Sequence, residues 1–201
     1  CFDPHEPFTA PERFKEAYKT GRNGKILDWP IYENVTNSAE EIAEIRGNYA
    51  ALTAMCDEYF GRLLDWMDAT NAWEDTALVL STDHGFLLGE HEWWGKNKMP
   101  YYDAISHIPL MIAHPDTATN AGKRVSALTQ TTDLMPTILE FHGIEAPHEA
   151  TSVSLAGLLR GEDGKRDCAI LGMFAGPLCV TDGRYTYFRF PVDINADALP
   201  L

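Results

Sequence analysis

A short apolar segment that leads directly into an acid and a histidine is the feature that most constrains how this chain can fold. Residues 77–80 are Ala-Leu-Val-Leu, which have the length and branched side chains of a buried β-strand. Asp83, His84 and Gly85 follow almost at once. In open α/β sheets, ligands gather beyond the carboxyl ends of the strands. The pattern therefore predicts a strand that presents Asp83 and His84 as metal ligands, with the simpler alternative of a polar turn at the strand end.

The segment before this strand predicts a long amphipathic helix. Ser38 and Glu41 have the spacing of a capping box, and a turn at residues 68–71 ends the segment. Apolar residues recur between them in steps of three and four: Ile42, Ile45, Tyr49, Leu52, Cys56, Tyr59, Leu63 and Met67. Because a helix that leads into a buried strand is half of a βαβ unit, we expect an α/β fold with a mainly parallel sheet flanked by helices.

Further elements follow the same rules along the first 150 residues. A short helix is expected at 11–19, a second strand at 107–113 and a helix at 132–142. In the last of these, Gly143 provides the end signal, and Leu134, Ile138 and Leu139 are expected to face the core.

The chain changes character after residue 150. A short helix is predicted at 154–160, and strand-like runs follow at 168–174, 178–181 and 184–190. Asp182-Gly183 lies between the last two runs and predicts a hairpin. We therefore expect two parts: residues 1–150 as part of an α/β domain, and residues 151–201 as a small antiparallel C-terminal subdomain.

Composition narrows the classes of partner. A formal net charge of −14 argues against nucleic acid and against an anionic membrane surface. No apolar run is long enough to cross a bilayer. The first residue is Cys1 and not Met, so we expect a piece of a longer protein, with bacterial cytoplasm and periplasm both open and the oligomeric state unknown.

The four cysteines do not predict a zinc site, because they show no C-x-x-C spacing. Cys56 falls on the apolar helical face, where a thiol acts as a small hydrophobic group. A disulfide between Cys168 and Cys179 across neighbouring strands remains open.

Two other residues are candidates for binding or catalysis. Lys96 follows Trp93 and Trp94, so one ammonium group lies among aromatic rings, which suits an anionic tetrahedral substrate. His5 lies between two prolines, which can hold an imidazole at a fixed angle. Taken alone, that stretch favours the simpler interpretation of a surface histidine in a Pro-rich turn.

The motifs between residues 82 and 110 carry a resemblance to a known family. They are Thr82-Asp83-His84-Gly85, Gly89-Glu90-His91, Trp94-Gly95-Lys96, Tyr101-Tyr102-Asp103 and Ile108-Pro109-Leu110. In this order they resemble the C-terminal half of the sulfatase family, a branch of the alkaline phosphatase superfamily. Supporting similarity at 3–8, 133–137 and 182–185 extends the resemblance over nearly the whole chain.

The resemblance implies roles for four residues. Asp83 and His84 would bind a divalent cation, which is usually calcium in sulfatases. By the same resemblance, His84 stands where many sulfatases have Asn and others have His. Because an imidazole is a softer ligand than an amide oxygen, manganese is an alternative, and magnesium stays open as a further one. Lys96 would contact a non-bridging oxygen of a sulfate ester, and His5 would lie near the nucleophile or leaving-group oxygen. His91 and His107 are expected to be supporting or packing residues.

The family's nucleophile is missing from this chain. Sulfatases use a formylglycine made from Cys or Ser in a C-x-P-S-R-like segment, and none of the four cysteines has that context. We therefore expect this chain to be a C-terminal fragment of a metal-dependent sulfatase. The full-length protein would hydrolyse sulfate esters of small molecules or sugars, and the fragment alone would be inactive. The alternatives are a phosphonate monoester or phosphodiester hydrolase of the same superfamily and a non-catalytic metal-binding scaffold.

Aromatic residues near Lys96 could line an aryl or sugar subsite or pack internally: Trp93, Trp94, Tyr101 and Tyr102.

Overall fold

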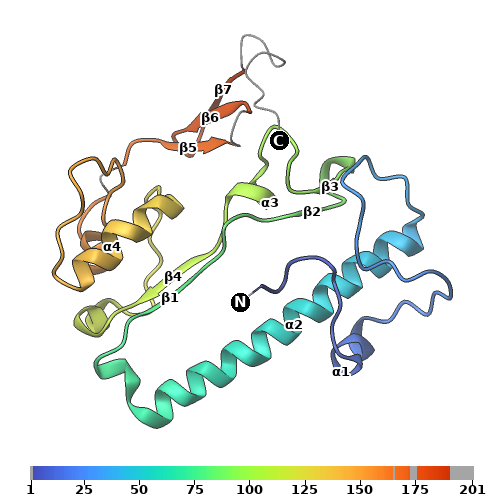
Figure 1. Cartoon of the computed structure of the whole chain (residues 1–201), viewed down its shortest axis with the longest axis horizontal. Helices are drawn as coiled ribbons and strands as arrows, with labels where there is room; N and C mark the ends of the chain where they lie inside the picture. Colours follow the sequence, from blue (N-terminus) through green and yellow to red (C-terminus); the bar gives the residue numbers. More distant parts are fainter. Residues whose placement is uncertain (1, 165, 173–175, 191–201) are drawn as a thin grey trace. The chain divides into compact units, whose positions relative to one another are not determined.

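The structure, a computed structural model, describes residues 2–164, 166–172 and 176–190, and its elements are labelled in Figure 1. The chain divides into two units. Unit 1 comprises Cys1–Asp75 and His84–Lys98, and unit 2 comprises Thr76–Asp83 and Met99–Leu201. The predicted division into 1–150 and 151–201 stays a prediction. Within the described ranges, no helix has the length and apolar character that a membrane span requires.

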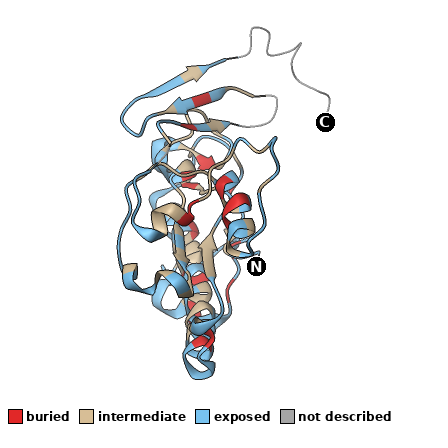
Figure 2. Cartoon of the chain, turned by 90° about the vertical axis from the view of Figure 1, so that its left-hand side faces the viewer, coloured by how far each residue is buried: buried red, intermediate tan, exposed pale blue. Residues whose placement is uncertain are grey.

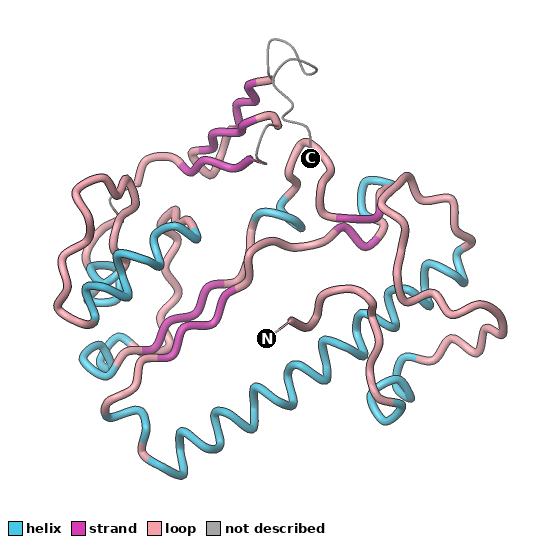
Figure 3. The backbone as a smooth tube through the Cα atoms, viewed as in Figure 1, coloured by secondary structure: helices cyan, strands magenta, loops and turns pink. Residues whose placement is uncertain are grey.

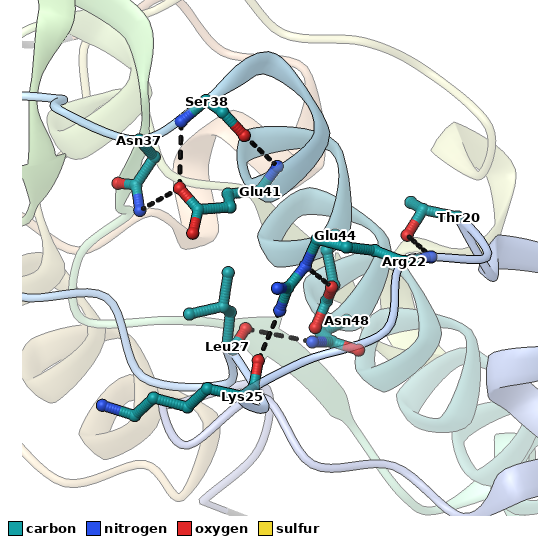
Figure 4. A network of polar contacts seen from close by, with 9 residues as sticks. All are labelled: Thr20, Arg22, Lys25, Leu27, Asn37, Ser38, Glu41, Glu44 and Asn48. Carbon is teal, nitrogen blue, oxygen red and sulfur yellow. Dashed lines mark hydrogen bonds and ion pairs between the residues drawn. The ribbon is translucent and has the colours of Figure 1, made fainter.

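The long helix of unit 1 begins where the sequence predicted. Helix α2 (Ala39–Thr70) has Ser38 as its N-cap. The Ser38 hydroxyl accepts from the Glu41 amide at 3.3 Å, and the Glu41 carboxylate accepts from the Ser38 amide at 3.0 Å (Figure 4). Both bonds satisfy amides that the first helical turn leaves unpaired. The helix ends at Asn71, whose φ of 55° is left-handed, as an αL C-cap requires.

The apolar stripe of α2 is only partly buried. Ile45, Leu52 and Met67 are buried, whereas Tyr59 is 52% exposed and Leu63 is 40% exposed. The prediction of one continuous buried stripe is therefore wrong for part of the helix. The reason is that the apolar cluster of unit 1 packs mainly on the first half of α2, as its members show: Phe8, Ala10, Phe14, Ile45, Ala51, Leu52 and Trp94.

The segment before α2 is mostly loop (Figure 3), with helix α1 (Glu12–Lys15) and the 3-10 turn η1 (Glu16–Tyr18) where a short helix was expected. Side-chain bonds tie this loop to α2 (Figure 4). Arg22 donates to the Glu44 carboxylate, and Asn48 donates to the Leu27 carbonyl at 3.0 Å. These bonds let a segment with little regular structure hold a defined path.

A small hairpin completes unit 1. Strands β2 (Leu87–Leu88) and β3 (Trp94–Gly95) pair antiparallel across the 3-10 turn η3 (Glu90–Glu92). The loop at residues 33–35 runs beside the hairpin: the Trp94 amide donates to the Glu33 carbonyl at 3.0 Å, and the Val35 amide donates to the Glu92 carbonyl at 2.9 Å. The short 3-10 turn η2 (Ala72–Glu74) follows α2.

In unit 2, strand β1 (Leu78–Ser81) pairs antiparallel with β4 (Leu110–Ala113), so Leu78 lies opposite Ala113 (Figure 1). Every strand pair among the described residues is antiparallel, and the expected parallel sheet is not found there. A βαβ unit needs a strand before its helix, and the residues before α2 supply none in the described part of the chain. Strand β1 is also half-buried along its length, not fully buried.

Three α-helices and two 3-10 turns lie in the described part of unit 2. They are α3 (Asp103–Ser106), η4 (Pro115–Asn120), η5 (Thr131–Asp133), α4 (Leu134–Phe141) and α5 (Ala156–Arg160). Gly143 and Gly161 follow α4 and α5 with positive φ, which confirms the end signal predicted at Gly143.

A buried carboxylate organises the start of α4. Asp133 is 0% exposed, pairs with the Arg166 guanidinium and accepts from the Gln130 and Val153 amides at 2.8 and 2.9 Å. One turn on, the Thr137 hydroxyl accepts from the Leu155 amide at 2.8 Å. The buried face of α4 therefore carries polar groups that bind a neighbouring segment.

This arrangement corrects the expected orientation of α4. Leu134 and Leu139 are half-buried, but Ile138 is 45% exposed, so the prediction that it faces the core is wrong. Asp133, Pro136 and Thr137 take the buried face, where the side chains of Asp133 and Thr137 bind the amides of Val153 and Leu155.

The C-terminal part forms the expected antiparallel sheet. Strands β5 (Ala169–Gly172), β6 (Leu178–Thr181) and β7 (Thr186–Arg189) pair in that order. Residues 173–174 of the first predicted run lie outside the described residues. Most side chains of β6 and β7 are exposed or half-buried (Figure 2). The hairpin between them turns at Asp182-Gly183, and Gly183 has φ +85°, which confirms the turn signal.

The described cysteines are free thiols. Cys168 is exposed and Cys179 is buried, so the disulfide left open by the sequence does not form. The register explains this, because Cys179 lies opposite Leu171 and not opposite Cys168. Cys56 is half-buried on α2, and burial raises the pKa of its thiol, as expected of a packing residue.

Asp133→Asn is expected to destabilise the protein by about 3 kcal/mol, because the change leaves the largely buried Arg166 without its charge partner. Asp116→Asn, at a side chain that is 89% exposed, makes the same chemical change and should stay within about 0.5 kcal/mol of the wild type. Urea unfolding of the three proteins measures both values. Equal stabilities of the two variants would contradict the role given to Asp133.

The Asp182 carboxylate is expected to titrate below its ordinary pKa. It accepts from the Tyr185 and Arg184 amides at 2.6 and 2.8 Å, and these bonds lower its pKa from 3.8. Since the folded-state pKa is depressed, the bonds stabilise the turn above the ordinary pKa and this contribution is lost as pH falls through the lowered value. The amide proton shifts of residues 184 and 185, followed by NMR during acid titration, should have a midpoint below 3.8; a midpoint above it would contradict the assignment.

Candidate active site

Lys96 is held at the end of the hairpin in unit 1. It follows β3, in which Trp94 is buried and donates its indole N–H to the Asn37 side chain at 2.9 Å. Gly95 has φ +120°, and a Cβ at this position would lie 2.9 Å from the Tyr32 ring. The Tyr32 ring therefore packs against the backbone immediately before Lys96. A residue with a side chain at position 95 would displace it.

The structure brings His5 and Lys96 together. Lys96 Nζ lies 2.8 Å from His5 Nε2, although 91 residues separate them in the chain. His5 Nδ1 lies 2.7 Å from the Glu6 carbonyl oxygen. A carbonyl oxygen only accepts and a lysine ammonium only donates, so Nδ1 carries the imidazole proton and Nε2 accepts from Lys96. The ring is thus held as one neutral tautomer.

Glu6 is a third member of the cluster, and the sequence analysis missed it. Its side chain is 3% exposed. One carboxylate oxygen lies 3.6 Å from Lys96 Nζ and accepts from the Tyr32 hydroxyl, and the other lies 3.4 Å from His5 Nδ1. A carboxylate between His5 and Pro7 was visible in the sequence, but nothing there indicated that Lys96 would lie beside it. No signal in the sequence indicated that Tyr32 would contact this cluster.

Asp83 and His84 remain candidates for metal binding. Asp83 is exposed two residues after the end of β1. It is the last residue of its segment in unit 2, whereas His84 begins the next segment of unit 1. His84 Nδ1 lies 3.0 Å from the Gly85 carbonyl oxygen, so Nδ1 carries a proton and Nε2 would be the nitrogen that binds a metal. This is the tautomer that histidine metal ligands commonly adopt when a carbonyl fixes Nδ1.

The fit to a divalent cation is partial. A carboxylate and an imidazole are suitable ligand types for manganese, and the carboxylate also suits calcium. Across residues 2–164, 166–172 and 176–190, no group of three or more His, Cys, Asp or Glu side chains could hold a metal ion. A complete site would need ligands besides Asp83 and His84.

The neighbouring aromatic and histidine residues divide between packing and surface positions. Trp94 is a packing residue. Trp93 is half-buried, and the Lys98 ammonium lies 4.0 Å from its ring centroid, which is a cation–π distance. Tyr101 and Tyr102 are half-buried in unit 2, and His91 and His107 are exposed.

A family model and two curated relatives all point to the same protein family. The sulfatase family model matches residues 2–144. An N-acetylglucosamine-6-O-sulfatase of Bacteroides thetaiotaomicron is 36% identical over 152 residues, covering 75% of this chain and 25% of that protein. An ulvan-active sulfatase of Formosa agariphila is 29% identical, covering 92% of this chain and 38% of its own length. The chain therefore spans well under half the length of these curated relatives.

A solved structure also matches. The phosphonate monoester hydrolase SpPMH of Silicibacter pomeroyi superposes with a TM-score of 0.71 and 29% identity, covering 78% of this chain and 34% of that one.

Gly95→Ala is expected to destabilise the protein by roughly 1–3 kcal/mol, because an alanine here has both an unfavourable φ and a clash with the Tyr32 ring. Gly61→Ala is the matched control: it lies inside α2 with nothing within 4 Å of the added Cβ, so it should stabilise by about 0.5–1 kcal/mol. Denaturant unfolding measures both. Opposite signs are expected, and two values of the same sign would contradict the account of position 95.

Proposed function

Because this chain belongs to the sulfatase family, we propose that it forms the C-terminal part of a metal-dependent enzyme that hydrolyses sulfate esters. The single observation that supports this most strongly is the 2.8 Å approach of Lys96 Nζ to His5 Nε2 in unit 1. Both residues were named from motifs of this family, at opposite ends of unit 1. A fixed cation beside a fixed imidazole suits transfer of an anionic group.

The proposed roles follow from the two side chains. Lys96 would bind a non-bridging oxygen of the ester, using an N–H that His5 does not occupy, and would stabilise negative charge on the transferred group. His5 would move a proton through Nε2, the nitrogen whose lone pair the cluster leaves as acceptor.

Asp83 and His84 would supply two ligands of the divalent cation, with calcium as the first choice and manganese or magnesium as alternatives. When bound, the cation would stabilise charge on the ester oxygens as a Lewis acid. The remaining ligands and the nucleophile, expected to be formylglycine, would come from parts of the longer relatives that this chain does not span. The 201-residue chain alone should therefore be inactive.

We propose a sulfated sugar as the substrate class. Two relatives are named for such activity, an N-acetylglucosamine-6-O-sulfatase and an ulvan-active sulfatase. The alternative is a phosphonate monoester hydrolase, which the match to SpPMH supports. Both chemistries transfer a tetrahedral anionic group, so Lys96 and His5 would have the same roles in each.

The full-length protein should hydrolyse an aryl sulfate or 6-O-sulfated N-acetylglucosamine faster than an aryl phosphonate. Lys96→Ala should lower kcat/KM by about 10²–10³ because a cation at the developing charge is lost. Lys98→Ala is the control: it removes a neighbouring ammonium that lies over the Trp93 ring, and it should leave kcat/KM within about threefold of the wild type. Steady-state kinetics with calcium or manganese, and after chelation, measures these effects.

The outcomes separate the alternatives. Faster turnover of phosphonate would move the protein to the phosphonate monoester hydrolases. Full activity of Lys96→Ala would refute the role of this residue, and full activity after chelation would refute the metal. No turnover of any ester by the full-length protein would leave a non-catalytic scaffold.

A further inference from the structure

The Glu6 carboxylate is the one member of the cluster that the proposed chemistry does not use. It is nearly sealed from solvent, at 3% exposure, whereas the Lys96 side chain is 21% exposed and the His5 side chain 32%. A group so deeply buried is poorly placed to touch a substrate. A buried carboxylate nevertheless needs a positive partner or several donors, since desolvation of its charge is otherwise costly.

Its contacts meet that need from three sides. Lys96 Nζ lies 3.6 Å from Oε1, the Tyr32 hydroxyl donates to the same oxygen, and His5 Nδ1 lies 3.4 Å from Oε2. Tyr32 is itself fixed, because its ring packs against Gly95, where the Cα carries no side chain. The hairpin backbone, through Tyr32, therefore determines where the carboxylate lies.

The carboxylate also lies where it holds the ammonium against the imidazole. An ammonium has three N–H groups; His5 Nε2 takes one, and the attraction of Glu6 directs the ammonium toward the same side. This leaves an N–H for an anionic oxygen, while the Glu6 backbone carbonyl accepts the proton that His5 carries on Nδ1. Without the carboxylate, a lysine on a flexible stem would take many rotamers.

We propose that Glu6 is a positioning residue that acts through Lys96: its buried charge, oriented by Tyr32, keeps Lys96 and His5 as one pre-ordered pair. This inference rests on the proposed function for its kinetic consequence, but the geometry of the pair can be tested without turnover. The position of a charged group within a site affects rate strongly, because small displacements lower the fraction of productive encounters.

The kinetic test is a double-mutant cycle in the full-length protein. Glu6→Gln keeps the shape of the side chain and removes its charge, and it should lower kcat by roughly tenfold to a hundredfold. In the Lys96→Ala background the same change should cost less than about threefold, since the residue through which Glu6 acts is gone. Glu16→Gln, at an exposed glutamate paired with Lys19 in the same unit, should have no effect in either background.

Equal losses from Glu6→Gln in the two backgrounds would overturn the proposal, because a purely structural role gives additive effects. A kcat within twofold of the wild type would also overturn it. If Glu6→Gln does not fold, Tyr32→Phe replaces it in the cycle: it removes one hydroxyl but keeps the ring against Gly95. The decrease in kcat caused by Tyr32→Phe should be smaller, and it should likewise vanish in the Lys96→Ala background. A decrease that persists in that background would refute the proposal.

A spectroscopic test separates this inference from the proposed function. In protein with isotope-labelled histidine, the His5 ring nitrogens, assigned by their disappearance in His5→Gln, should report a proton on Nδ1 in the wild type. In Glu6→Gln the Nε2 signal should change as Lys96 leaves the ring. An unchanged signal would overturn the role of Glu6 even in an active enzyme, and the expected change would support it even if no ester were hydrolysed.

Discussion

Burial of Trp94 is the constraint on which unit 1 depends. Its side chain lies in the same apolar cluster as Phe8 and Leu52, so the N-terminal loop, the long helix α2 and the hairpin are packed around one indole ring. The indole N–H would be an unpaired donor in this core, and Asn37, one residue before the helix cap, accepts its hydrogen bond at 2.9 Å. A single residue thus fixes the helix start and the hairpin together.

The polar cluster consists of His5, Glu6 and Lys96, which lie next to members of this apolar core in the sequence. His5 and Glu6 precede Phe8 in the loop, and Lys96 follows Trp94 by two residues, so core packing holds the loop and the hairpin side by side. The charged groups themselves contribute little to stability, since a buried carboxylate and a lysine must both give up hydration. Their value is geometric, because hydrophobic burial supplies the free energy that keeps the charged groups close.

Unit 2 is organised by a different interaction. The buried Asp133 links Arg166 and the amides of Gln130 and Val153, so one carboxylate joins the start of α4 to two segments that follow it in the chain. Gln130 also donates to the Ile170 carbonyl of β5 at 2.9 Å. Gln130 therefore links this network to strand β5 of the C-terminal sheet through a polar bond.

Local signals in the sequence determined the capped start of α2 at Ser38 and the turn at Asp182-Gly183, because such features depend on residues a few positions apart. The sequence also named His5 and Lys96, through motifs of a known family. Only the tertiary structure decided that strands β1 and β4 pair antiparallel and that Glu6 lies close to both His5 and Lys96. Strand direction and contacts across 91 residues depend on how separate segments pack, and local propensity carries no information about that packing.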